Sequence, residues 1–196
     1  MNYLISLPGL LIAIVFHEFA HGYSAYLLGD PTAKNAGRLT LNPIKHIDPI
    51  GFLFMLVFRF GWAKGVPINP KYFKNRKRDT IIVSLAGVFT NFTLALLIGS
   101  IIVYLPIKNE VIVEMLVITL WYNIMLGVFN LLPFPPLDGS KVIASLLPTK
   151  YEYYFYKYEK YFYLVLILLI ATNYIQRIIG PLVEFVYNMV IRLLLF

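Results

Sequence analysis

The feature that most constrains this chain is a series of apolar runs that are long enough to cross a lipid bilayer. The runs at about 3–28, 81–105 and 112–132 each reach the roughly 20 residues that a membrane-spanning helix needs. Two further apolar stretches lie at 162–175 and 182–196. Only 14% of the residues are charged, whereas a soluble domain has about 25%. The sequence therefore predicts an integral membrane protein and argues against a soluble enzyme.

The arrangement of these runs predicts an all-α polytopic membrane protein with about five to six membrane segments. The apolar stretch 51–61 has only 11 residues and is too short to span as a helix. We therefore expect a short re-entrant or β-hairpin-like element between the first and second full spans. Gly180-Pro181 is expected to end one segment before the last apolar stretch begins. We expect one domain, 1–196, with a catalytic core at about 1–148 and C-terminal membrane segments at about 160–196.

The basic residues predict the orientation of the chain. Ten Lys and Arg residues lie between 29 and 79 and four lie between 141 and 160, but only one lies in the loop 106–110. The positive-inside rule places the first two regions on the cytoplasmic side, and the two spans between them supply the even number of crossings that this requires. The N-terminus is then outside. The excess of Lys and Arg in loops beside an anionic leaflet explains the net charge of +7. No nucleic-acid partner is therefore expected.

The segment His17-Glu18-Phe19-Ala20-His21 forms an H-E-x-x-H motif inside the first apolar run. Residues four apart on a helix lie on one face, so both imidazoles can bind one zinc ion while Glu18 reaches a water beside the metal. The alternative, two polar contacts inside a helix bundle, is weaker because ionisable groups within a span are costly and usually functional. The motif predicts one Zn²⁺ per chain, with Glu18 as the catalytic base.

A hydrolytic zinc site needs a third protein ligand and an open position for water. The chain has no cysteine, so the third ligand must be His, Asp or Glu. The candidates are His46, Glu184 and Asp138, of which Asp138 is the strongest. It follows a proline-rich segment that breaks the helix after 132, and irregular backbone at membrane depth must line a cavity or be buried. The alternative for Asp138 is a helix N-cap, because it begins Asp-Gly-Ser before an apolar run.

These motifs resemble those of the site-2 protease family of intramembrane zinc metalloproteases (peptidase family M50). The resemblance lies in the H-E-x-x-H motif and in Asn130-x-x-Pro133-x-Pro135-x-Leu137-Asp138-Gly139. Supporting stretches are Gly37–Pro43, His46–Pro49, Gly61–Lys64 and Ser84–Asn91. Over residues 10–145 the chain is similar to the compact branch without a PDZ or CBS domain, which implies a prokaryotic cell membrane. Val88 and Gly65 depart from the family pattern, since proline is expected at each position.

The resemblance implies that His17, His21 and Asp138 hold zinc, that Glu18 is the general base, and that the substrate is a transmembrane peptide or membrane protein within the lipid bilayer. The active site would open to the cytoplasmic side. Asn91 and Asn130 are uncharged donors in or beside spans, so they are candidates for stabilising the oxyanion or positioning the substrate. Their alternative role is a hydrogen bond between membrane helices. Two other functions remain possible: a membrane zinc transporter and a scaffold that binds membrane clients without cleaving them.

Overall fold

The computed structural model describes residues 3–58 and 61–195. Its helices are, in chain order, α1 (Tyr3–Leu27), α2 (Thr32–Asn35), η1 (Pro43–Lys45), α3 (Pro49–Phe58), η2 (Pro70–Tyr72), α4 (Arg76–Tyr104), α5 (Glu110–Asn130), α6 (Asp138–Leu146), α7 (Thr149–Lys157), α8 (Glu159–Ala171) and α9 (Tyr174–Leu195). Four of them, α1, α4, α5 and α9, are long and apolar enough to cross a membrane. The all-α class is confirmed over the described residues, whereas the expected five to six segments are not.

Between the first two full spans the described residues contain a short helix, and the expected re-entrant or hairpin-like element is not confirmed. Helix α3 has 10 residues, which is too few to span. Among the described residues around it, the strand pairing consists of one isolated antiparallel bridge between Ile47 and Ala63. Arg59 and Phe60, which belong to the stretch considered in the sequence analysis, lie outside the described residues.

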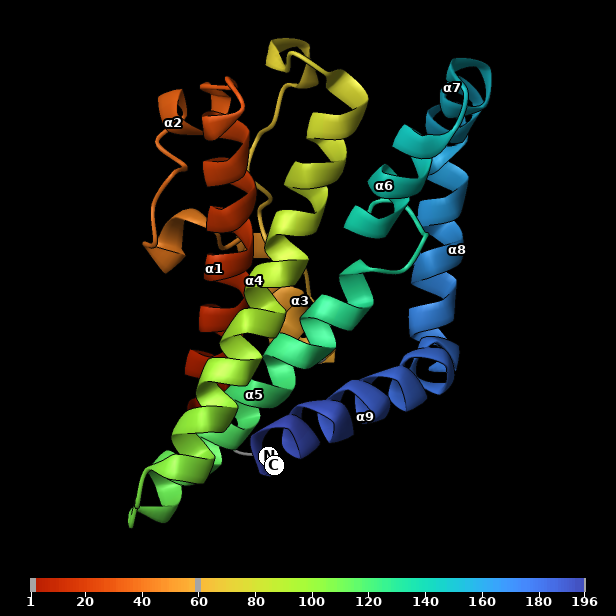
Figure 1. Ribbon diagram of the computed structural model, residues 1–196. Coiled ribbons are helices and arrows are strands. Elements are labelled where there is room, and N and C mark those ends of the chain that lie inside the picture. Colours follow the sequence, from red (N-terminus) through yellow and green to blue (C-terminus); the bar gives the residue numbers. More distant parts are fainter. Residues whose placement is uncertain (1–2, 59–60, 196) are drawn as a thin grey trace.

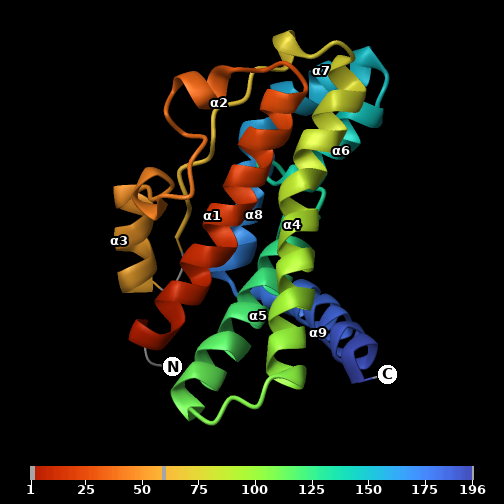
Figure 2. The same ribbon diagram turned by 60° about the vertical axis from the view of Figure 1, so that its left-hand side comes forward.

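Helices α1, α4 and α5 pack on one another and form the centre of the molecule. Figure 2 shows α1 and α4 side by side over much of their length, with α3 on the far side of α1. Small residues allow close approach at these crossings. A Cβ atom on Gly9 of α1 would lie 2.6 Å from the Thr119 hydroxyl of α5, and one on Gly127 of α5 would lie 2.8 Å from the Phe92 ring of α4.

Helices α4 and α5 begin earlier than the apolar runs suggested, because asparagine side chains cap them. The Asn75 side chain accepts from the backbone N–H of Arg78 at the start of α4, and the Asn109 side chain accepts from the backbone N–H of Val111 at the start of α5. The basic residues 76–78 therefore form the first turn of α4. The start of α4 lies at the same end of the molecule as α2 and α7, and the turn between α4 and α5 lies at the opposite end (Figure 1).

Helix α9 corrects the expectation that Gly180-Pro181 separates two segments. The chain turns instead at Thr172 and Asn173, where Asn173 has a φ of 57°, and α9 continues through Pro181 without a break. The buried side chains of Ile179 and Val183 on either side of the proline belong to the core that α9 shares with α4 and α5. Burial of this apolar face outweighs the loss of one backbone hydrogen bond at Pro181. Helix α8 has only 13 residues.

Candidate metal centre

The two histidines of the H-E-x-x-H motif lie near the middle of the molecule, on the face of α1 that packs against α4. His17 and His21 are each only 4% exposed. The third side chain comes from far along the sequence, because Asp138 is the first residue of α6 and is also 4% exposed. These three residues form the one group of three or more potential metal ligands among the described residues.

Asp138 reaches α1 because α6 begins very close to the end of α5. A Cβ atom on Gly139 would lie 2.2 Å from the Leu131 carbonyl oxygen, so only glycine fits at this position. The N-cap residue of α6 is Leu137, and Asp138 Oδ2 lies 3.1 Å from His17 Nε2 and 2.9 Å from His21 Nε2. The alternative that Asp138 is an N-cap is therefore not what the structure shows.

The hydrogen-bond network assigns the protons of both imidazoles. His17 Nδ1 lies 2.6 Å from Asn91 Oδ1, and His21 Nδ1 lies 2.7 Å from the Val83 carbonyl oxygen. Both oxygens only accept, so each Nδ1 carries the proton and each Nε2 carries a lone pair. The two Nε2 atoms are 3.0 Å apart. Three potential ligand atoms thus face one another at close range, an arrangement that could hold a metal ion.

Zinc fits this arrangement. Two imidazole nitrogens and one carboxylate oxygen are ligands that Zn²⁺ binds tetrahedrally at about 2.0–2.2 Å, which would separate the ligand atoms by about 3.3 Å. The distances of 2.9–3.1 Å among the three atoms are close to that value. A Cβ atom on Gly87 of α4 would lie 2.6 Å from His21 Nε2 and 2.7 Å from His17 Cε1. Glycine at this position therefore leaves room for the two rings.

Asn91 holds the His17 ring rather than facing an open space. Its side chain is completely buried, and its Nδ2 donates to the Ala13 carbonyl oxygen and to Asn123 Oδ1, both at 3.0 Å. Asn123 in turn donates to the Thr119 carbonyl oxygen at 2.9 Å. This network, which links α1, α4 and α5, orients the ring and strengthens it as a ligand. The sequence analysis did not identify Asn123, although a buried amide in a span is itself a signal of such a role.

Lys141 is a second residue that the sequence analysis did not identify as part of the site. It was counted among the basic residues that set the topology, but its Nζ donates to Asp138 Oδ1 at 2.9 Å. Burial raises the pKa of Asp138, and the positive charge of Lys141 is among the contributions that lower it below its usual range. Asp138 is therefore a carboxylate at neutral pH.

Glu18 lies on a neighbouring face of α1, about 100° around the helix from His17. Its Oε2 accepts from the backbone N–H of Val66 at 2.8 Å. Val66 belongs to a non-helical segment, 61–69, that Arg38 supports by donating to the Lys64 and Gly65 carbonyl oxygens at 2.5 and 3.2 Å. Of the two positions that depart from the family pattern, Gly65 lies beside Glu18, and Val88 is buried in the fold.

A pocket of about 400 Å³ opens next to His21, between the segment 61–69, α4 and the start of α6. Its wall includes His21 and Lys141. Apolar side chains of Val66, Ile68 and Phe73 line another part of it. Arg76 and Tyr156 also contribute to the lining. The pocket is thus partly apolar and has cationic groups near His21.

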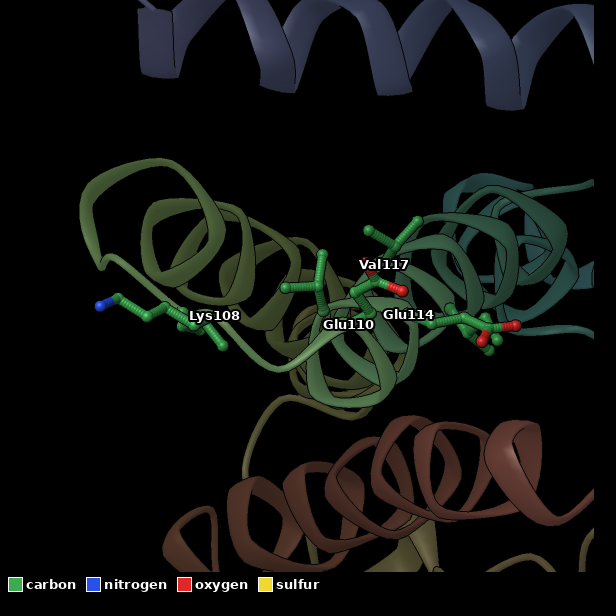
Figure 3. A pocket seen from close by; sticks show the side chains of 7 residues that line it. Lys108, Glu110, Glu114 and Val117 are labelled. Carbon is green, nitrogen blue, oxygen red and sulfur yellow. The ribbon is translucent and has the colours of Figure 1, made fainter.

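The remaining candidate residues lie outside this cluster. His46 is buried, and its Nε2 lies 2.7 Å from the Thr40 carbonyl oxygen. Asn130 donates to the Leu126 carbonyl oxygen of its own helix, and Glu184 is exposed on α9. Glu114 lines a separate hollow of about 340 Å³ at the start of α5, shown in Figure 3, which is not part of the metal centre. None of these residues joins the three potential ligands.

Comparison with known proteins agrees with this chemistry. Residues 102–172 match the sequence profile of Peptidase family M50. The chain is 42% identical over 150 residues to the "Putative zinc metalloprotease YwhC" of Bacillus subtilis (strain 168), covering 71% of this chain and 67% of that protein. It is 28% identical over 192 residues to the "Putative zinc metalloprotease Rip2" of Mycolicibacterium smegmatis (strain ATCC 700084 / mc(2)155), covering 95% and 74%.

No solved structure matches the chain. The identity to YwhC extends over two thirds of that protein, and the profile match includes the segment that carries Asp138. On this evidence the chain belongs to peptidase family M50, the site-2 protease family of integral membrane metalloproteases whose cofactor is Zn²⁺.

Proposed function

We propose that this protein is an intramembrane zinc endopeptidase that hydrolyses peptide bonds within or near the transmembrane segments of membrane proteins. In this proposal His17, His21 and Asp138 hold the metal, and Glu18 is the general base. The observation that carries it is the convergence of three acceptor atoms at 2.9–3.1 Å, two from histidines of α1, a helix long enough to span a membrane, and one from Asp138 at the start of α6. Glu18 next to these ligands distinguishes a hydrolytic site from a structural one.

The chemistry is divided between the metal and the chain. When bound, Zn²⁺ lowers the pKa of a coordinated water to about 7 and polarises a carbonyl group. Glu18 takes a proton from the attacking water and later delivers it to the leaving amine. The backbone N–H of Val66 holds the Glu18 carboxylate at 2.8 Å. Because the hydrogen bond uses only Oε2, Oε1 remains available for the proton.

The substrate in this proposal is a membrane-embedded peptide that unwinds locally. His21 lies six residues before the end of α1 at Leu27, which is about 9 Å along the helix at roughly 1.5 Å per residue. A helix has all its backbone groups bonded internally, so cleavage requires an extended stretch of substrate. The pocket beside His21 can accept a side chain of such a stretch, and the neighbouring segment 61–69, which is not helical, is where the substrate backbone could pair. Water would enter from the cytoplasmic side.

The decisive experiment uses purified protein in liposomes with model transmembrane substrates. Glu18→Gln should keep its zinc and lose cleavage by about 10²–10⁴-fold, because Gln keeps the size of the side chain but cannot accept the proton. Asp138→Ala should lose most of its zinc, because two imidazoles remain as ligands. Zinc is measured by elemental analysis and cleavage by mass spectrometry of the products.

Glu114→Gln is the matched control, because Glu114 lies in the separate hollow and should leave zinc content and cleavage unchanged. Near-wild-type cleavage by Glu18→Gln would remove the general base from the proposal. Zinc uptake into the liposomes without cleavage would favour a transporter, and substrate capture without cleavage by the wild type would favour a scaffold.

A further inference from the structure

Hydrolysis of a peptide bond places negative charge on the carbonyl oxygen, and the transition state needs hydrogen-bond donors there in addition to the metal. The two amides considered in the sequence analysis are engaged elsewhere. Asn91 donates to Ala13 and Asn123, and Asn130 donates to Leu126 of its own helix. The described part of the site therefore needs a different donor for this oxygen.

Lys141 has the position and the free donors for this role. Its Nζ is 2.9 Å from Asp138 Oδ1, whereas the other oxygen of the same carboxylate faces both histidines. A single carboxylate thus separates the Lys141 ammonium from the metal centre. An ammonium group has three donors, and Asp138 is its one hydrogen-bond partner among the described residues. Two donors remain for another acceptor.

The surroundings of Lys141 place these donors where a substrate lies. Lys141 lines the same pocket as His21. The other cation in the pocket wall, Arg76, is committed to Glu152 through two hydrogen bonds of 2.5 and 2.7 Å. Of the two cations in that wall, Lys141 is the one that donates to Asp138 and so lies next to the candidate ligands. A peptide carbonyl that enters the pocket next to His21 comes within the reach of its flexible side chain.

We propose that Lys141 is a further catalytic residue, which donates a hydrogen bond to the carbonyl oxygen of the scissile bond as that carbon becomes tetrahedral. This inference rests on the proposed function. The water oxygen forms a bond to the carbonyl carbon, the water proton moves to Glu18, and the π electrons move onto the carbonyl oxygen. Lys141 keeps its proton throughout. When the oxygen re-forms the double bond, the C–N bond breaks and the amine takes the proton from Glu18.

The test separates this role from simple support of Asp138. Lys141→Met removes the donors and keeps an unbranched side chain. We expect kcat to fall by about 10²–10³-fold with KM changed by less than about threefold, because an oxyanion donor acts in the transition state. Zinc affinity, measured by chelator competition, should stay within about threefold. Affinity for a phosphinic peptide, which mimics the tetrahedral carbon, should fall with kcat.

Two further variants sharpen the result. Lys141→Arg keeps the charge and donors and should recover part of kcat and of phosphinic-peptide affinity. Lys150→Met, at an exposed lysine on α7, should change neither quantity. If Lys141→Met loses zinc and kcat together, Lys141 only supports Asp138 and the inference is overturned. It is also overturned if kcat and phosphinic-peptide affinity do not change in Lys141→Met. Tyr156 lines the same pocket and is the other candidate donor, so a loss of kcat and affinity in Tyr156→Phe but not in Lys141→Met would overturn the inference as well.

The same measurements distinguish failure of this inference from failure of the proposed function. If the wild type binds zinc but neither cleaves a transmembrane substrate nor binds the phosphinic peptide, the proposed function is wrong and this role is excluded with it. If the wild type cleaves and Lys141→Met cleaves equally well, the proposed function stands and only the role of Lys141 is removed.

Discussion

The buried amide of Asn91 illustrates how single residues prepare the site for its metal. Its oxygen accepts from His17 Nδ1, and its nitrogen binds the α1 backbone at Ala13 and the α5 side chain Asn123. Together the three hydrogen bonds hold the Asn91 amide in one orientation. The amide in turn fixes the His17 ring, so the lone pair on His17 Nε2 points in one direction. Outer partners of this kind tune a metal site as much as its ligands do.

Asn91→Ala should therefore weaken zinc binding by about 10–100-fold, because the His17 ring loses its hydrogen-bond acceptor. Chelator competition measures the effect. Asn130→Ala removes an equally polar side chain that binds only its own helix, and it should leave zinc affinity unchanged. Equal losses in both variants would show that amides in these spans act through general stability and not through the ring of His17.

At the scale of elements, α7 is tied to the start of α4 by a buried carboxylate. Glu152 is only 4% exposed, and it accepts two hydrogen bonds from Arg76. Lys77 adds a contact to Glu152 at 3.9 Å and a hydrogen bond to the Leu147 carbonyl oxygen. Since α6 and α7 follow each other directly, this connection also helps to hold the helix that begins with Asp138.

The same connection predicts a dependence of stability on pH. The hydrogen bond from Arg76 lowers the pKa of Glu152, and the charges of Arg76 and Lys77 add to this, although burial opposes it. A folded pKa below the unfolded value, near 4.3, stabilises the fold above that value, and the stabilisation is lost as the pH falls through the folded pKa. Glu152→Gln should therefore lower the free energy of unfolding by about 1–3 kcal/mol at neutral pH.

Thermal unfolding in detergent between pH 3.5 and 7 measures this effect. The difference in Tm between wild type and Glu152→Gln should shrink towards the acid end. Glu159→Gln serves as the control, because Glu159 forms no ion pair with any described residue. A difference in Tm that stays constant with pH would mean that the ionised carboxylate is not what holds α7.

The elements also show which sequence rules were sufficient. His17 and His21 were predicted to act together because a spacing of four residues has the same meaning in any helix, and the structure places them 3.0 Å apart. The end of a segment at Pro181 was predicted from an equally local rule and was wrong. There the burial of Ile179 and Val183 against other helices determined the outcome, and such packing is not encoded in the spacing of the residues themselves.

For the molecule as a whole, the arrangement of the helices agrees with the charge pattern of the loops. The start of α4 and helix α7 lie at one end, and the turn around Lys108 lies at the other (Figure 1). The partners of Asn91 and Lys141 could not be predicted, because they depend on how helices that are distant in sequence meet. Asp138 was predicted because its proline-rich segment had to be buried at membrane depth.

This arrangement predicts the topology in a form that is simple to measure, since the chain has no native cysteine. Single cysteines at Lys74, Lys108 and Lys150 are labelled in intact cells with a membrane-impermeant maleimide. We expect labelling only at position 108, because the positive-inside rule keeps the basic regions in the cytoplasm. Labels at 74 and 150 should appear in inverted vesicles. If positions 74 and 150 were labelled from opposite sides of the membrane, this would contradict the prediction that α4 and α5 together cross it twice.

The long-range contacts of His17 also bear on how the protein is made. Its partners Asn91 and Asp138 lie 74 and 121 residues further along the chain, so at about 5–20 residues per second α6 leaves the ribosome on the order of 6–24 s after α1. Until then α1 carries two imidazoles and a carboxylate that lack their partners, in a bilayer where such groups are costly. We therefore expect α1 to insert securely only when later helices arrive, and the metal to be loaded after translation of α6.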